Sequence, residues 1–284
     1  MKSLKTYLLV LVMVTGLICA SPVNVLATTN VPTIPAETVY SENGITIATS
    51  KIEYDNSWRY YFVDAVISNN SSMDVNYEIE YIIINGFQIQ TFTFGDVYSG
   101  MSADVEIAIN PDSLSLAKIE HMMDIEVCFR LSESDDYNNI IDTPVIKIAT
   151  SDAGKYKQSY EFEGQEVYNA GGIRILARLG ESNEYFPVLL FVENNSGKTV
   201  SFMYEDVAIN NKMVSEMMTG GRVVSSAIQV IEMDRDLLTM WIDDIPQNKD
   251  ISAIDFKLSF MPIENDGSFS TGNMYLSDRI TLTR

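Results

Sequence analysis

Hydrophobic and polar side chains alternate along much of this chain. Five apolar or aromatic residues occupy every second position of one segment: Val75, Tyr77, Ile79, Tyr81 and Ile83. Up to residue 80 the positions between them are polar, and a period of two predicts a strand with one face on a core and one in water. Asn85-Gly86 then provides the positive φ angles of a tight turn, and residues 87–94 return as a second strand.

Several short sequence motifs of the first half of the chain recur in the second half. The sequence ISNNS at 67–71 recurs as VENNS at 192–196, and Ile84–Gly86 recurs as Ile209–Asn211, both at an offset of 125 (194 minus 69). Further landmarks recur at 128 (44–45 with 172–173), at 131 (124–129 with 255–260) and at 134 (146–148 with 280–282). Small loop insertions account for the different offsets between landmarks. The chain is therefore predicted to hold two divergent copies of one module.

Counting such runs predicts an all-β fold: two tandem immunoglobulin-like β-sandwich domains of about seven strands each. One short helical turn is expected around residues 113–121, with a counterpart around 234–244. A closed barrel is the alternative architecture. The predicted boundaries are a signal peptide at 1–27, a flexible leader at 28–42, copy 1 at 43–150, a linker at 151–165 and copy 2 at 166–284.

The first residues predict export. A basic start is followed by the apolar run 8–20 and then by Ala27, after which cleavage is expected. The apolar run is shorter than the about 20 residues that span a bilayer as a helix, so a membrane anchor is disfavoured, and no second run follows. Cys19 would be the lipid-bearing residue of a lipoprotein, but the bulky Ile18 before it argues against that. The predicted location is secreted or on the cell surface.

The net charge of the chain disfavours some classes of binding partner. The formal net charge is −20, and removal of Lys2 and Lys5 with the leader makes it −22. Such a surface repels phosphate backbones and anionic lipids, so nucleic acid and membrane-surface roles are disfavoured. The acidic stretches 133–139 and 264–268 resemble fragments of calcium loops but lack the full ligand spacing, so no metal or other cofactor is predicted.

A family resemblance accompanies these patterns. Its landmarks are Asn43-Gly44-Ile45, the Asn-Asn-Ser motif, Ile84–Gly86, Gly100, Leu114, Ile119 and a late Ile-x-Ile-x-Thr strand. Together they resemble the immunoglobulin-like modules of exported proteins and lipoproteins of Gram-positive gut anaerobes. Copy 2 departs from the pattern at Asn211, where the glycine is missing. The resemblance implies a fold and a location, and no chemistry.

Catalytic motifs are sparse. His121 is the one histidine, in the predicted helical turn, where a packed or rim position is expected. Phosphate loops, His-Glu-x-x-His helices and Cys-x-x-Cys pairs do not occur, so the chain is predicted not to be an enzyme. A pair of carboxylates could still support glycoside hydrolysis. The acids considered for it are Glu126, Asp135, Asp136, Asp243 and Asp244.

Aromatic residues cluster at 58–62. Alternation assigns Tyr61, Val63, Ala65 and Ile67 to the core, and their counterparts are Phe186, Val188, Leu190 and Val192. Trp58 and Tyr60 are left on the opposite face. They could stack on a sugar ring or on another protein. The favoured interpretation is that they lie at the contact between the two sandwiches.

Cys128 is the one cysteine left after cleavage, so no internal disulfide can form. Ile125, Val127, Phe129 and Leu131 alternate as the core face of a strand, which puts Cys128 on the other face, and the offset of 131 makes Ser259 its counterpart in copy 2. A partly exposed thiol is predicted, with a disulfide-linked dimer as its consequence.

These observations predict a non-catalytic module pair that acts in binding or as a spacer, with an unknown protein or glycan as partner and no membrane insertion after signal removal. The alternative is a carbohydrate-binding protein that uses the Trp58 and Tyr60 face. An acid-pair hydrolase is the third, disfavoured hypothesis.

Overall fold

The computed structural model describes residues 31–133, 136–182, 184, 186–233, 238, 246–263 and 274–284, without the side chains of 136–139 and 215–219. The predicted signal peptide with Cys19, the acids Asp135, Asp243 and Asp244, the side chain of Asp136, the stretch 264–268 and most of the predicted turn at 234–244 therefore lie outside the described residues.

The N-terminal copy, as the term is used below, comprises the following elements: β1 (Glu37–Glu42), β2 (Ile45–Asp55), β3 (Tyr60–Asn69), β4 (Val75–Ile84), β5 (Phe87–Ile89), β6 (Phe94–Val97), β7 (Met101–Ile109), α2 (Pro111–Leu116), β8 (Asp124–Glu133), β9 (Asp136–Asp142) and β10 (Ile146–Ala149). The C-terminal copy comprises β11 (Gln165–Ala170), β12 (Ile173–Leu179), β13 (Val188–Asn194), β14 (Thr199–Ile209), β15 (Lys212–Val223), β16 (Ala227–Glu232), η1 (Asn248–Asp250), β17 (Ala253–Ile263), β18 (Tyr275–Leu276) and β19 (Ile280–Thr283).

Strand order identifies the sandwich type. In the N-terminal copy one sheet runs β1-β2-β3-β7, and the other runs β10-β8-β4-β5, with β6 also on β4 and β9 also on β8. Here β2, β3 and β7 take the places of strands A, B and E of an immunoglobulin domain, and β10, β8 and β4 take those of G, F and C. The C-terminal copy repeats this order as β11-β12-β13-β16 and β15-β14-β17-β18, with β19 on β17. The predicted all-β, immunoglobulin-like sandwich architecture is confirmed.

The Asn-Asn-Ser motif has a structural role, because its first asparagine hydrogen-bonds the backbone of neighbouring segments. The buried Asn69 amide donates to the carbonyl oxygens of Met73 (2.7 Å) and Val97 (2.9 Å), while its oxygen accepts from the backbone and hydroxyl of Ser71. Asn194 makes the same four bonds to Lys198, Val223 and Ser196. These bonds satisfy backbone groups that would otherwise be buried without partners. The repeat read from the sequence therefore preserves a local hydrogen-bond network.

The predicted hairpin turns are also equivalent. Asn85 and Gly86 have φ of 51° and 84°, and Asn210 and Asn211 have φ of 50° and 65°. Asparagine tolerates this left-handed region better than most residues, so the missing glycine does not change the turn. The Asn85 oxygen accepts from the backbone of Met123 and Asp124, and the Asn210 oxygen accepts from Ser252 and Ala253.

These matched bonds correct the alignment of the two copies. The partners of Asn85 and Asn210 differ by 129 residues (252 minus 123), not by the 131 taken from sequence. Strand pairing agrees, since Ile84 is opposite Ile125 and Ile209 is opposite Ile254. The structural counterpart of Cys128 is therefore Lys257, and Ser259 was assigned wrongly. The error of two residues preserved the strand period, so the assignment of faces was unaffected.

A β-bulge changes the predicted face of β4. Pairing with β8 shifts between Ile79 and Tyr81, which inserts Glu80 as an extra residue. Beyond the bulge Ile82 and Ile84 point into the core of the N-terminal copy, while Tyr81 and Ile83 pack against the core cluster of the C-terminal copy. The prediction that Tyr81 and Ile83 face their own core is wrong, because a bulge reverses the alternation. A bulge that includes Asp206 does the same in β14, where Val207 and Ile209 are buried.

The predicted flexible leader is ordered over the part that the structure describes. Residues 37–42 form β1 on the edge of β2, and Tyr40 is buried. Ile34 packs into the core, and the backbone of Thr33 exchanges hydrogen bonds with Ser151. The prediction of flexibility from two prolines and small polar residues missed the apolar side chains at these two positions.

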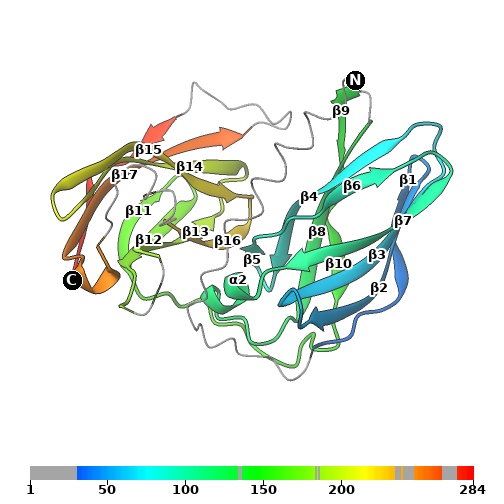
Figure 1. Ribbon diagram of the computed structural model, residues 1–284, viewed down its shortest axis with the longest axis horizontal. Helices are drawn as coiled ribbons and strands as arrows, with labels where there is room; N and C mark the ends of the chain where they lie inside the picture. The colour runs from blue at the N-terminus through cyan, green and yellow to red at the C-terminus, as the bar shows by residue number, and fades with distance from the viewer. Residues whose placement is uncertain are drawn as a thin grey trace.

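The two copies meet along one strand edge. Figure 1 shows them side by side, with β5 and β16 where they meet. Ile228 of β16 pairs in parallel with Phe87 of β5, and the Gln88 side chain donates to the Arg222 carbonyl and accepts from the Val224 amide. The joint therefore joins one sheet of each copy into a single hydrogen-bonded sheet.

Aromatic side chains pack against one another at this joint. The Phe87 ring stacks on Tyr160 from the segment between the copies (5.6 Å between centroids) and meets Phe191 edge-on (6.1 Å). Phe191 also stacks on Phe162 at 5.3 Å. The predicted linker, 151–165, contains no strand before Gln165, where β11 begins, yet Tyr160 and Phe162 make this segment part of the joint.

Candidate binding surface

Trp58 stands at the tip of the β2–β3 hairpin. The Asp55 carboxylate accepts hydrogen bonds from the backbone of Ser57 (2.6 Å) and Trp58 (3.0 Å), and Arg59 completes the turn with φ of 60°. An aspartate that bonds the backbone two or three residues on stabilises such a turn locally. The Trp58 side chain is consequently held in solvent and is 74% exposed.

Two further rings continue from this tip along the outer face of β3, and a third contacts one of them from the segment between β5 and β6. The three rings are called the aromatic strip here: Tyr60, Phe62 and Phe92. The Tyr60 ring lies 6.3 Å from Phe62 and 5.4 Å from Phe92, edge-on to the latter, and Phe92 is 61% exposed. Hydroxyls of Thr91 and Thr93 hold the Phe92 segment on β7 by donating to the Ala108 and Glu106 carbonyls.

The favoured sequence interpretation of Trp58 and Tyr60 is wrong. The joint between the copies is built from Phe87, Tyr160 and Phe191, and Trp58 points into water. Tyr60 is half-buried, but against Phe92 of its own copy. Sequence periodicity identified the correct outer face, but it did not show which surface the other copy covers.

Carboxylates surround the aromatic strip. Glu53 of β2 is opposite Phe62, and farther along the same face Asp64 of β3 is opposite Glu106 of β7. The negative charge of Asp112 adds to partial burial in raising the pKa of the Tyr60 hydroxyl, which locates this carboxylate near that ring. The surface is therefore aromatic and acidic together.

The prediction of a partly exposed Cys128 is also wrong. The side chain is 4% exposed, and its thiol donates to the Thr143 carbonyl at 3.3 Å. Tyr81, turned outward by the bulge at Glu80, hydrogen-bonds the thiol from β4. Burial, with the nearby charge of Asp142, raises the pKa of Cys128 from 9.0 to about 11. A buried, protonated thiol does not favour the predicted disulfide-linked dimer.

Residues considered for catalysis have structural contacts. The His121 ring stacks on Tyr156 at 3.5 Å and lies 3.3 Å from an Asp152 carboxylate oxygen. Glu126 pairs with Lys147 at 2.7 Å. Within the described ranges no group of three or more His, Cys, Asp or Glu side chains could hold a metal ion, and no helix is long and apolar enough to cross a membrane.

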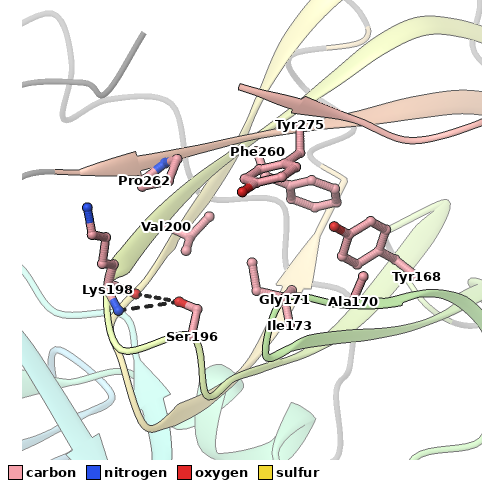
Figure 2. A pocket seen from close by; sticks show the side chains of 10 residues that line it. All are labelled: Tyr168, Ala170, Gly171, Ile173, Ser196, Lys198, Val200, Phe260, Pro262 and Tyr275. Atoms are coloured by element: carbon pink, nitrogen blue, oxygen red, sulfur yellow. Dashed lines mark hydrogen bonds between the residues drawn. The ribbon is translucent and has the colours of Figure 1, made fainter. Parts of the chain in front are cut away.

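The C-terminal copy contains a hollow that sequence reasoning missed. It opens between the edge strands β11 and β18, has a volume of about 140 Å³ and is lined by Tyr168, Ala170, Gly171, Ile173, Ser196, Lys198, Val200, Phe260, Pro262 and Tyr275. Figure 2 shows the rings of Tyr168, Phe260 and Tyr275 gathered around it. It is smaller than the roughly 300–1,000 Å³ of sites that enclose drug-sized ligands, and its lining residues within the described ranges include no carboxylate. Its residues come from five strands and two turns that are spread over more than 100 residues of sequence, so no local motif could reveal it.

Comparisons with other proteins add little. Neither family models nor curated proteins give a match to this chain. Among solved structures it is similar to the Salmonella enterica SafA pilin in complex with the SafB chaperone, at 12% identity and a TM-score of 0.25 over 84% of this chain and 98% of that one. It is also similar to the Amycolatopsis orientalis exo-chitosanase CsxA, at 11% identity and a TM-score of 0.21 over 82% and 26%. TM-scores this low support no inference about function.

Proposed function

We propose that this protein is a non-catalytic, exported binding protein and that its ligand contacts Trp58 and the aromatic strip of the N-terminal copy. Export rests on the signal-like leader and on the resemblance to exported immunoglobulin-like modules. The binding role rests on one observation: a tryptophan held 74% exposed by its own turn, at the end of a row of partly exposed rings. Tryptophan and tyrosine are the residues that contribute most to binding patches, whereas an inert surface has few of them.

Carbohydrate is the second candidate ligand. The exposure of Trp58 favours it, because the flat face of an indole can stack on the apolar face of a sugar ring. Acid-pair hydrolysis has less support. The buried carboxylate of Glu80 forms ion pairs with Arg130 and Arg222, and Arg130 also contacts Glu78 and Asp142, so the carboxylates gathered there are engaged in ion pairs.

The test is binding of residues 28–284 to a glycan array and to cell-wall and exported-protein fractions, with Trp58→Ala as the variant. We expect saturable binding to at least one of these, weakened at least tenfold by the substitution. Tyr275→Ala is the matched control, because Tyr275 is also aromatic and 54% exposed but lies in the C-terminal copy. Binding that Trp58→Ala leaves intact would refute the assignment, and loss confined to Tyr275→Ala would move the site to the hollow.

A further inference from the structure

The face that carries the aromatic strip is strongly acidic. Six of its described side chains are carboxylates: Glu53, Asp55, Asp64, Asp104, Glu106 and Asp112. Lys51 is the base among them, and its ammonium already contacts Glu53 (2.5 Å) and Asp64 (3.2 Å). Six negative charges and one positive charge leave a formal charge of −5, or −4 if Arg59 of the adjoining turn is counted.

Three of these carboxylates are exposed and uncompensated. No described lysine or arginine forms an ion pair with Asp104, Glu106 or Asp112. On the equivalent sheet of the C-terminal copy, by contrast, Arg174 forms ion pairs with both Glu166 and Glu193, at 2.9 Å each. The uncompensated charge is thus a property of the N-terminal face rather than of every outer face in the chain.

Rings and carboxylates together define the partner's chemistry. The electron-rich face of an aromatic ring attracts a cation, and desolvation by a bound partner strengthens that attraction. Nearby carboxylates attract the same cation, steer it during encounter and repel anions. A neutral sugar would use the rings but gain nothing from five excess negative charges.

The spacing matches an extended polypeptide. Tyr60, Phe62 and Asp64 alternate with core residues along β3, so their side chains leave the face about every 6.8 Å. Alternate side chains of a peptide in extended conformation have the same repeat. A segment with lysine or arginine at every second position can therefore place successive cations over the rings and beside Asp64 and Glu106.

We propose that the aromatic strip and its carboxylates bind an extended basic segment of another polypeptide. This inference rests on the proposed function, since it names the partner of the same surface. On the corresponding face of the C-terminal copy Phe191 is buried against Phe87 at the joint, so that part of the face is not available for a second site.

The experiment uses a fluorescein-labelled octapeptide of alternating lysine and threonine, titrated with residues 28–284 and followed by fluorescence anisotropy. We expect saturable binding in 20 mM salt that weakens at least tenfold in 300 mM salt, because salt screens exposed charges. The same peptide with acetylated lysines should lose at least tenfold in affinity. An alternating glutamate and threonine peptide should not bind.

Asp64→Asn/Glu106→Gln is the decisive variant, and it should weaken binding of the lysine peptide at least tenfold. Glu161→Gln/Glu163→Gln removes the same charge from two exposed residues between the copies and should leave affinity within twofold. Circular dichroism melting checks that both variants are folded. Equal losses in the two variants, or no binding of the lysine peptide, would overturn the proposal.

The two proposals fail separately. A ligand found on the arrays that is lost in Trp58→Ala, together with silence of the lysine peptide, would retain the binding surface and reject the basic partner. Peptide binding that depends on Asp64 and Glu106 but not on Trp58 or Phe92 would reject the aromatic contribution.

Discussion

The outer faces of β3 and β13 occupy the same place in the two copies but have different environments. Val66 on β3 corresponds to Phe191 on β13, since they are paired with the equivalent residues Ala48 and Leu176. Phe191 is 2% exposed beneath Phe87 and Phe162, whereas the face around Val66 has no such cover and carries Phe62 and Asp64. One scaffold position thus serves assembly in the C-terminal copy and is open in the N-terminal copy.

The same place in two similar sandwiches can thus carry surfaces of different chemistry. Apolar residues such as Phe191 make one outer face an interface, where a shared sheet joins the copies. Acidic and aromatic residues kept the other face accessible to water. A fold supplies the frame, and the side chains placed on it decide what each surface does.

The largest expected loss of stability comes from a substitution in the joint between the copies. Phe87 of one hairpin corresponds to the exposed Lys212 of the other, because each follows the turn and pairs with the last residue of the preceding strand. Phe87→Ala should lower the free energy of unfolding by about 3–5 kcal/mol, as for a buried ring, whereas Lys212→Ala should change it by less than about 0.5 kcal/mol. Urea unfolding followed by circular dichroism measures both, and similar values would show that the two hairpins are used alike.

The second prediction compares the two bulges. The Glu80 side chain is 6% exposed and forms ion pairs with Arg130 of its own copy and with Arg222 of the other copy. Asp206, at the second bulge, forms an ion pair with Lys257 at the surface. Glu80→Gln should destabilise the protein by about 2 kcal/mol, because it removes the buried charge that pairs with Arg222 and one of the three carboxylates around Arg130. Asp206→Asn should have a much smaller effect, since exposed pairs contribute little and asparagine suits the φ of 52° at this site. Thermal unfolding of the two variants tests this, and a larger loss for Asp206→Asn would contradict it.

The third prediction concerns pH, and its effect is confined to alkaline solution. Burial raises the pKa of Cys128 from 9.0 to about 11 in the folded protein, so folding favours the protonated thiol. The contribution of this thiol to stability is complete below about pH 9 and is lost as the pH rises towards 11, by on the order of 3 kcal/mol. Cys128→Ala should flatten the decline in stability over this range relative to the natural chain. Parallel declines in the two proteins would show that the thiol environment differs from the one described.

Strand faces were predictable wherever the backbone stays regular. Tyr61, Val63, Ala65 and Ile67 were assigned to the core from alternation alone and are each at most 3% exposed. The turn at Asn85-Gly86 was predictable because its chemistry is local. Val188, Leu190 and Val192 in the C-terminal copy are likewise buried as predicted.

Features set by distant neighbours were not predictable. The burial of Cys128 depends on Tyr81, whose orientation depends on the bulge at Glu80, and nothing in the local sequence marks that bulge. The exposure of Trp58 could not be decided either, because it depends on which outer face the other copy covers. The aromatic face was found from the pattern at 58–62, but Phe92 joins it from a separate segment by contacting Tyr60.

The joint between the copies also bears on the order of folding events. Its hydrogen bonds join Gln88 to partners 134 and 136 residues away, whereas each sandwich is built largely from nearer pairings. Closing so long a loop costs entropy before any contact rewards it, so the joint should form after both sandwiches and be the first contact to open. In a protein under shear or tension, that opening would expose Phe87 and Phe191 before either core unfolds.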